Sequence, residues 1–418
     1  MKGFRAFHPE AVWRRYRRLT IGTKILIFMA LGVVAGALFG ESAAVVQPLG
    51  DVFIRLLMMA AVPLVFFNLC GGLTGLTDVR SLGRITAKIA IYYAVTSLLS
   101  FSLALAAMSL LKPGAGFKLI GAPPEGIGRV PDIVDVLVKM VPDNIFKAFA
   151  EGQMIQIVLF AALLGVTILL LPEAFKAPLT RGLTVLARLF RELVNLVLKA
   201  GPLGIGALMA SAVGRYGSGM LGPLGLFLGG VWGTQIVMMA VFLLILFLFT
   251  RMTPGAFFRQ TGPVYATAVA TCSSWASLAV ALEVSEDRLK LPKNIYPFTL
   301  PLGIQMNKNG TAVMLVGVLL FTAQASGIRF DLATMATIIL TGLVLETGSG
   351  GIPGGGLVIA LIFVKAFDLP LEVAAVVGGI YRLIDMGNTA TNMMSDMVGT
   401  IIVSRSEMRK AGAAAPAS

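Results

Sequence analysis

Residues 332–364 read LATMATIILTGLVLETGSGGIPGGGLVIALIFV, two apolar arms on either side of a glycine-rich tip at 346–356. Each arm is shorter than the ~20 residues that a helix needs to cross the hydrocarbon core of a bilayer. Non-helical backbone at membrane depth is stable only where protein or a water-filled cavity surrounds it. The stretch therefore predicts a re-entrant helical hairpin inside an all-α polytopic membrane protein.

Similar interruptions occur on both sides of this hairpin. They are Thr271-Cys272-Ser273-Ser274 within Val264–Leu282, Gln305–Thr311 within Leu300–Phe321, and a polar face within Val373–Val403. A hairpin followed by an interrupted helix thus occurs twice, over 256–290 with 293–325 and over 332–366 with 371–403. Paired broken segments of this kind are typical of inverted-repeat transporters and mark their binding site.

The chain before residue 251 has a simpler pattern of uninterrupted apolar runs. They are Ile25–Gly40, Leu56–Leu76, Ile89–Leu111, Ile155–Leu171, Leu193–Val213 and Pro223–Thr250. Each is close to spanning length. The pattern predicts six ordinary transmembrane helices ahead of the two hairpin-and-helix units.

The composition excludes a soluble protein. Of 418 residues, 57% are apolar and 13% charged, about half the charged share of a soluble domain. Two cysteines and one histidine are too few for a disulfide framework or a zinc site. No cofactor and no metal site are expected, and the chain is not expected to be an enzyme.

The net charge of +13 is concentrated outside the apolar runs. Met1–Lys24 carries seven basic residues against one acid, and further basic residues lie in the 78–88 loop and near the carboxyl terminus. Basic residues next to membrane spans remain cytoplasmic. The pattern predicts a multi-pass protein of the inner cell membrane with both termini in the cytoplasm. Aromatic interleaving typical of nucleic-acid binding does not accompany the basic clusters, so no nucleic-acid partner is expected.

The last apolar segment carries a polar stripe. Its members are Arg382, Asp385, Thr389, Asn392 and Asp396, spaced 3, 4, 3 and 4 residues apart. That spacing places all five on one helix face, and such a face in a membrane lines a cavity or a partner helix. The alternative is that Arg382 and Asp385 only pair with each other.

Three other polar or bulky residues stand out in the broken segments. Lys308 needs an anionic partner, either Asp396 or Asp385, unless it extends to the membrane surface. Glu346 either lines a cavity or lies at the interface. Trp275 is bulky for a hairpin tip and is expected to have a packing role. Unpaired backbone N–H groups at the two hairpin tips, with Arg382, would hold an anionic substrate.

These motifs resemble the glutamate/aspartate, neutral amino acid and dicarboxylate transporter family. The matching motifs are Val141-Pro142-Asp143-Asn144 with Glu151-Gly152-Gln153, Tyr296–Gly303, and Gly351-Ile352-Pro353-Gly354. The resemblance covers nearly the whole chain. It implies a homotrimer of protomers with eight transmembrane helices and two hairpins, inverted repeats and an elevator mechanism.

The resemblance also implies a division of the chain. Scaffold helices one and two would occupy 1–81, and scaffold helices four and five 116–220. Helix three of the transport domain would occupy 82–115, and the core of that domain 221–418. Substrate would contact Ser273, Ser274, Thr311, Gly351, Gly354, Arg382, Asp385, Asn388, Thr389 and Asn392. The cation-coupling positions would be Tyr93, Thr96, Ser97, Asn307, Lys308, Asn309 and Asp396.

The sequence departs from the family pattern at the cation site. Asn309 and Tyr381 stand where the family has carboxylates, Lys308 stands where it has methionine, and only Asp396 remains of three acids. An ammonium there takes the electrostatic role of a bound Na⁺ and repels a second cation. We expect sodium-independent transport, with a proton as the candidate coupling ion through Lys308, Asp385 or Glu346.

The substrate is expected to be a small carboxylate. Arg382 favours a C4-dicarboxylate, whereas Asp385 favours an amino group, and Asn388 stands where carriers of acidic amino acids have arginine. An aspartate or neutral amino acid transporter, with or without sodium, is the alternative. An anion channel is the alternative from another class, although continuous polar faces are absent before residue 250.

Overall fold

The computed structural model describes residues 19, 21–74, 83–117, 138, 141–151, 153–346 and 355–410, and over these its regular structure is entirely helical. The first helices are α2 (Ile21–Phe39), α3 (Gln47–Thr74), α4 (Gly83–Leu111), α6 (Ile145–Glu151), α7 (Met154–Leu170), α8 (Glu173–Leu198), α9 (Gly201–Tyr216) and α10 (Leu221–Thr250). Then follow α11 (Pro254–Thr271), α12 (Ser274–Glu283), α13 (Tyr296–Met306), α14 (Asn309–Ala325), α15 (Leu332–Glu346), α16 (Gly355–Ala366) and α17 (Leu371–Lys410). Short 3-10 turns are η1 (Gly40–Val46), η2 (Pro113–Gly116) and η3 (Gly217–Met220), and η4 (Val284–Arg288) is a π-helical turn. The all-α class is confirmed for the described chain.

One expected span is broken by a bend. The run Leu193–Val213 is not a single helix, because α8 ends at Leu198 and α9 begins at Gly201 with a bend of 53° between them. Pro202 lies in the first turn of α9, where its missing N–H costs nothing. The apolar run therefore straddles a helix boundary.

Length and composition alone mark fewer spans than the sequence pattern does. Among the described residues, Thr23–Leu56, Gly83–Gly116 and Gly222–Thr250 are long and apolar enough to cross a membrane, and the bent α8–α9 pair adds a fourth. Helices α15 and α16 are too short to pass this test, with 15 and 12 residues. Helix α17 is long enough but carries the polar stripe. The count of eight transmembrane helices stays a prediction.

Both expected hairpins have their helical arms. In the first, α11 ends at Thr271 and α12 starts at Ser274, and the Ser273 side chain accepts a hydrogen bond from Ala276 N at 3.2 Å as the N-cap. In the second, α15 and α16 are the arms. The predicted tip residues Gly351 and Gly354 lie outside the described residues.

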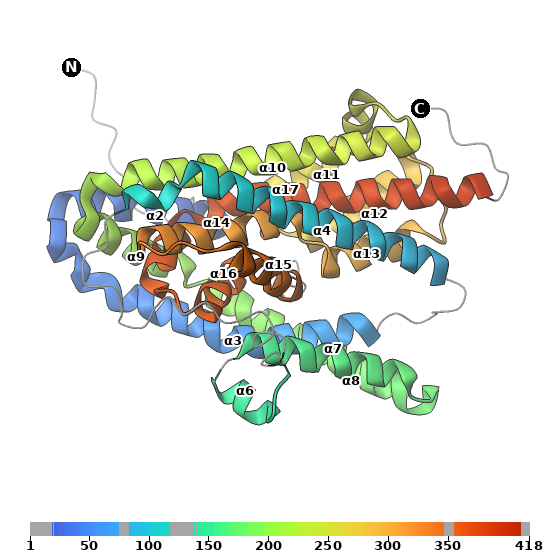
Figure 1. Cartoon of the computed structure of the whole chain (residues 1–418), viewed down its shortest axis with the longest axis horizontal. Coiled ribbons are helices and arrows are strands. Elements are labelled where there is room, and N and C mark those ends of the chain that lie inside the picture. Colours follow the sequence, from blue (N-terminus) through green and yellow to red (C-terminus); the bar gives the residue numbers. More distant parts are fainter. Residues whose placement is uncertain are drawn as a thin grey trace, which may run out of the picture.

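The helices gather into two groups that Figure 1 separates in one view. One contains α4, α10 and α17, which contact one another, and the other contains α3, α7 and α8, with α3 in contact with both partners. Helices α9 and α16 contact members of both groups. This grouping resembles the expected scaffold and transport domains, whose boundaries stay a prediction.

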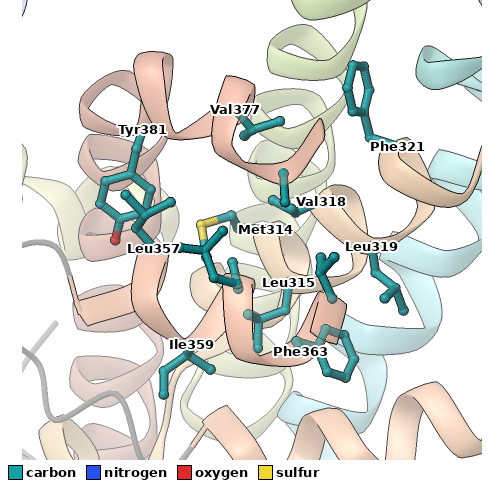
Figure 2. Packing of buried hydrophobic residues seen from close by; sticks show 14 of the residues in the cluster. Met314, Leu315, Val318, Leu319, Phe321, Leu357, Ile359, Phe363, Val377 and Tyr381 are labelled. Atoms are coloured by element: carbon teal, nitrogen blue, oxygen red, sulfur yellow. The ribbon is translucent and has the colours of Figure 1, made fainter. Parts of the chain in front are cut away.

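Part of the main apolar core lies where α14, α16 and α17 meet. Figure 2 shows Met314, Leu315 and Val318 of α14 facing residues of the other two helices. Every residue from Asn309 to Ala323 is buried, so α14 is surrounded by protein on all sides. A helix this enclosed can carry polar groups that lipid would not tolerate.

An ion-pair cluster ties the beginning of α4 to the end of α17. Arg84 and Lys88 both pair with Glu407, where α17 has left its apolar stretch. The hydrogen bonds from Arg84 and Lys88 lower the pKa of Glu407 to about 2. The amino-terminal cluster and Arg80 lie outside the described residues, and the orientation of the termini stays a prediction.

Candidate substrate and cation site

The polar residues of the site surround a break between α13 and α14. Asn307 (φ −106°, ψ 109°) and Lys308 (φ −130°, ψ 44°) leave the helical conformation. The break lies within the interruption expected over Gln305–Thr311, and Gly310 lies in the first turn of α14. Residues distant in sequence stabilise the break, since Asn307 Nδ2 donates to Asp396 Oδ1 at 2.7 Å and Gly310 N donates to Asn392 Oδ1 at 2.7 Å.

Asn309 is the centre of a buried hydrogen-bond network. Its amide nitrogen donates to Asn307 Oδ1 at 2.6 Å, to Ser395 Oγ at 2.8 Å and, at 3.4 Å, to Thr96 Oγ1. Its oxygen accepts from Ser100 Oγ at 2.9 Å. The sequence pattern did not single out Ser100 or Ser395. Their spacing could have done so, because Ser100 lies one helical turn after Thr96 and Ser395 adjoins Asp396.

Helix α4 also contributes buried residues to the site. The hydroxyl of Tyr93 donates to Thr299 O at 3.0 Å. A Cβ built on Gly303 would lie 2.4 Å from both Tyr93 Oη and Asp396 Oδ1, so these two oxygens converge above that glycine. Thr96 and Ser97 are buried on the same helix, and Ser97 is a hydrogen-bond neighbour of Glu346.

Lys308 is buried, with 1% of its surface exposed, which excludes the alternative that it extends to the membrane surface. Its ammonium donates to the backbone carbonyl of Ile304. No acid of the described chain lies within 4.0 Å of it, so neither Asp396 nor Asp385 forms the expected direct ion pair. Asp396, Glu346 and Asp385 are nevertheless the anionic charges that act on it.

Six of the seven expected cation-coupling residues therefore gather near one break, and the seventh, Ser97, lies next to Glu346; their role stays a prediction. The oxygens there come from amides, hydroxyls, the backbone carbonyls of Thr299 and Ile304, and Asp396. Within the described chain no group of three or more His, Cys, Asp or Glu side chains is arranged to hold a metal ion. The built-in charge at this position is an ammonium.

Arg382 links α17 to the first hairpin. Its guanidinium donates to Ala270 O at 3.2 Å and to Thr271 O at 3.5 Å, next to the tip with Ser273 and Ser274. The side chain is only partly buried. Because guanidinium has five N–H donors, this anchoring leaves others for a ligand carboxylate.

Other expected substrate residues follow Arg382 along α17. Asp385 accepts a hydrogen bond from the Tyr381 hydroxyl at 2.9 Å, and Asn392 Nδ2 donates to Thr311 Oγ1 at 3.3 Å. Thr389 is buried on the same helix. The polar stripe is thus one continuous face, directed at the α13–α14 break and the first hairpin.

Asn388 points elsewhere. Its Oδ1 accepts from Gln235 Nε2 of α10 at 2.7 Å, and its Nδ2 contacts Met314 Sδ at 3.3 Å. Gln235 also donates to Gly310 O at 3.3 Å. The sequence pattern missed Gln235, although a lone amide within an apolar helix was a signal that it had a polar partner. The substrate role of Asn388 stays a prediction.

Gly310→Ala is expected to destabilise the protein by about 1–3 kcal/mol, the usual cost of overpacking a close contact. A Cβ there would lie 2.4 Å from Asn388 O and 2.7 Å from Asn388 Cα, and backbone cannot rotate away. The apparent melting temperature of purified protein measures this. Gly229→Ala is the matched control, because a Cβ there meets no atom within 4 Å, and equal melting temperatures for the two variants would contradict the packing argument.

Trp275 packs away from the polar stripe, as expected for a structural residue. The Arg191 guanidinium lies 5.0 Å from its ring centroid, which joins α8 to the first hairpin. Together they line a cavity of about 390 Å³ with Gly71, Arg188 and Gln305. This cavity contains none of the expected substrate residues.

Comparison with known proteins places these features in a family context. The Sodium:dicarboxylate symporter family matches residues 21–406. A C4-dicarboxylate transport protein of Cupriavidus taiwanensis is 28% identical over 390 residues, covering 91% of this chain and 90% of its own. A proton/glutamate-aspartate symporter of Bacillus subtilis is 28% identical over 395 residues, covering 93% and 95%.

Proposed function

Because the chain belongs to the sodium:dicarboxylate symporter family, we propose that it carries a small carboxylate, with a C4-dicarboxylate as first candidate, without sodium. Family membership makes it a multi-pass membrane protein and a transporter, not an enzyme. The substrate and the coupling ion are the parts that we propose.

The observation that carries the substrate assignment is the position of Arg382. Its guanidinium is anchored on hairpin carbonyls and partly exposed beside Ser273 and Ser274. Guanidinium groups bind carboxylates in a bidentate geometry that a neutral side chain does not provide. A second carboxylate of a C4-dicarboxylate would be the ligand of this group, and the C4-dicarboxylate transport proteins similar to this chain support that choice.

An acidic amino acid is the second candidate. Asp385 is an acid one turn from Arg382, and it would bind an amino group. A relative of comparable identity is a proton/glutamate-aspartate symporter. The hydrogen bond that Asp385 accepts from Tyr381 favours the dicarboxylate, because it already occupies one carboxylate oxygen.

Sodium independence rests on Lys308. A buried ammonium acts electrostatically on Asp396, the remaining acid of the cation site, and the Asn309 amide stands where the family has a carboxylate. Two cations at such distances in a low-dielectric interior repel each other by several kcal/mol, about 4 kcal/mol at 4 Å with an effective dielectric of 20. A fixed cation therefore disfavours Na⁺ binding, and a proton is the coupling ion that we propose.

The remaining features follow the family pattern. We propose a homotrimer in the inner membrane with both termini in the cytoplasm, in which a transport domain moves past a scaffold. An anion channel would conduct without saturation. Saturable counterflow of labelled succinate in proteoliposomes is expected for the carrier, and its absence alongside a sustained current would favour the channel.

A binding screen tests the substrate assignment. Succinate, fumarate, malate, aspartate and serine are titrated against purified protein by calorimetry. Succinate, fumarate or malate is expected to bind at least about tenfold more tightly than serine, because one carboxylate fewer loses a charge-assisted bidentate contact. If aspartate binds more tightly than each dicarboxylate, the substrate assignment would change from a C4-dicarboxylate to an acidic amino acid.

A further inference from the structure

Three buried acids act electrostatically on Lys308: Asp396, Glu346 and Asp385. Asp385 lies one turn from Arg382 on α17, which leaves Asp396 and Glu346 as the two acids that share Lys308. Glu346 is 2% exposed and Asp396 is fully buried, and both act electrostatically on the ammonium. The open alternative that Glu346 lies at the interface is excluded by this burial. One ammonium balances one carboxylate, so the two acids cannot both be ionised without leaving a net negative charge in the interior.

The two acids differ in their hydrogen-bond partners. Asp396 Oδ1 accepts from the amide nitrogen of Asn307, and because that nitrogen can only donate, it favours the ionised carboxylate. Glu346 has Ser97 as its side-chain neighbour, and a hydroxyl serves a neutral acid as well as an ionised one, because it both donates and accepts. The second carboxylate oxygen of each acid, Glu346 Oε2 and Asp396 Oδ2, has no hydrogen-bond partner within the described part of the chain, so the contrast lies in the first oxygen alone.

Few charges face Glu346 from the helices that pack against α15, which are α4, α7, α14 and α16. The sequences of α7 and α14 contain no ionisable residue, and the only one in α16 is Lys365 in its last turn. The two basic residues at the beginning of α4 are both paired with Glu407. Of the two tyrosines of α4, the Tyr93 hydroxyl contacts Thr299 and the Tyr92 hydroxyl contacts Ser395. In the described structure, Lys308 at the N-cap of α14 is therefore the charge that faces Glu346, with Asp396 of α17 beyond it.

We propose that Glu346 binds and releases the transported proton. The inference rests on the proposed role of Lys308 as a built-in cation. When an O–H bond forms on the Glu346 carboxylate, Lys308 and Asp396 balance each other and the buried cluster is neutral. When the proton leaves to water, a net negative charge remains, which is unfavourable while the site is closed to solvent. Protonation of Glu346 therefore stabilises the state in which the site is closed to solvent and the transport domain can move.

Glu346→Gln tests this, because it imitates the protonated acid and cannot release a proton. In proteoliposomes without sodium, uptake driven by an inward proton gradient is expected to fall at least about tenfold, the scale of losing a proton-transfer group. Counterflow, which needs no net proton movement, is expected to fall by less. Glu346→Asp, which keeps an ionisable group, should retain gradient-driven uptake with a shifted pH profile. Glu372→Gln, an exposed acid at the start of α17, should behave as the unmodified protein does.

Three outcomes would overturn the inference. The first is gradient-driven uptake by Glu346→Gln equal to that of the unmodified protein. The second is an unmodified protein that takes up substrate without sodium but does not respond to a proton gradient; that result also rejects the proton as coupling ion, but it leaves sodium-free carboxylate transport standing. The third is a pH profile of uptake in Glu346→Asp that equals the profile of the unmodified protein. This outcome decides the question if Glu346→Gln fails to fold. Loss of all sodium-free uptake by the unmodified protein would instead overturn the proposed function itself.

Discussion

Lys308→Met is expected to lower sodium-free uptake by about 100-fold or more, the largest effect of any single substitution considered. Removing one member of a buried charge cluster leaves the other uncompensated, which costs about 3–5 kcal/mol, and about 1.4 kcal/mol corresponds to a factor of ten. Methionine is an unbranched side chain one atom shorter than lysine, and it removes the ammonium that donates to Ile304 O and acts on Asp396. Initial rates of succinate uptake into proteoliposomes measure the effect.

A double substitution separates lost function from lost folding. Lys308→Met with Asp396→Asn removes one charge of each sign, so its melting temperature is expected to recover toward that of the unmodified protein while uptake stays low. Uptake by Lys308→Met equal to that of the unmodified protein would show that the lysine takes no part in the transport cycle.

Arg382→Ala is expected to weaken dicarboxylate binding by about 100-fold, the range of about 2–5 kcal/mol for removing one partner of a hydrogen-bonded charge pair. Alanine also removes the contacts with Ala270 O and Thr271 O that hold α17 against the first hairpin. Arg382→Lys keeps the positive charge but loses the bidentate geometry, so it should bind with intermediate affinity. Calorimetric titration with succinate measures all three proteins.

Arg259→Ala is the matched control, because Arg259 is an exposed arginine on α11 of the same hairpin. Its succinate affinity should equal that of the unmodified protein. Unchanged affinity in Arg382→Ala would reject Arg382 as a substrate ligand and return the substrate to the open alternatives.

The sequence predicted helical elements well where neighbouring residues determine the structure, such as a helix cap or a short apolar arm. The first hairpin turns next to Ser273, which caps α12, and the short arms on either side of 347–354 are helical. The prediction of one unbroken helix over Leu193–Val213 failed, because hydropathy does not detect a bend between two apolar helices. Pro202, in the first turn of α9, was the signal available there.

The sequence grouped several polar residues of the candidate site, but it missed Ser100, Ser395 and Gln235 and did not give the geometry. The spacing along α17 grouped Arg382, Asp385 and Asn392 correctly on one face. The position of the α13–α14 break depends on Asn307 and Asp396, which lie 89 residues apart, and no local pattern contains that contact. The orientation of the Asn388 amide depends likewise on Gln235, 153 residues away.

The most direct test of the central claim is uptake of labelled succinate into proteoliposomes in which choline replaces all sodium on both sides. The built-in ammonium of Lys308 predicts that the initial rate is the same in choline as in sodium. A rate that falls to background in choline and returns on adding sodium would contradict it.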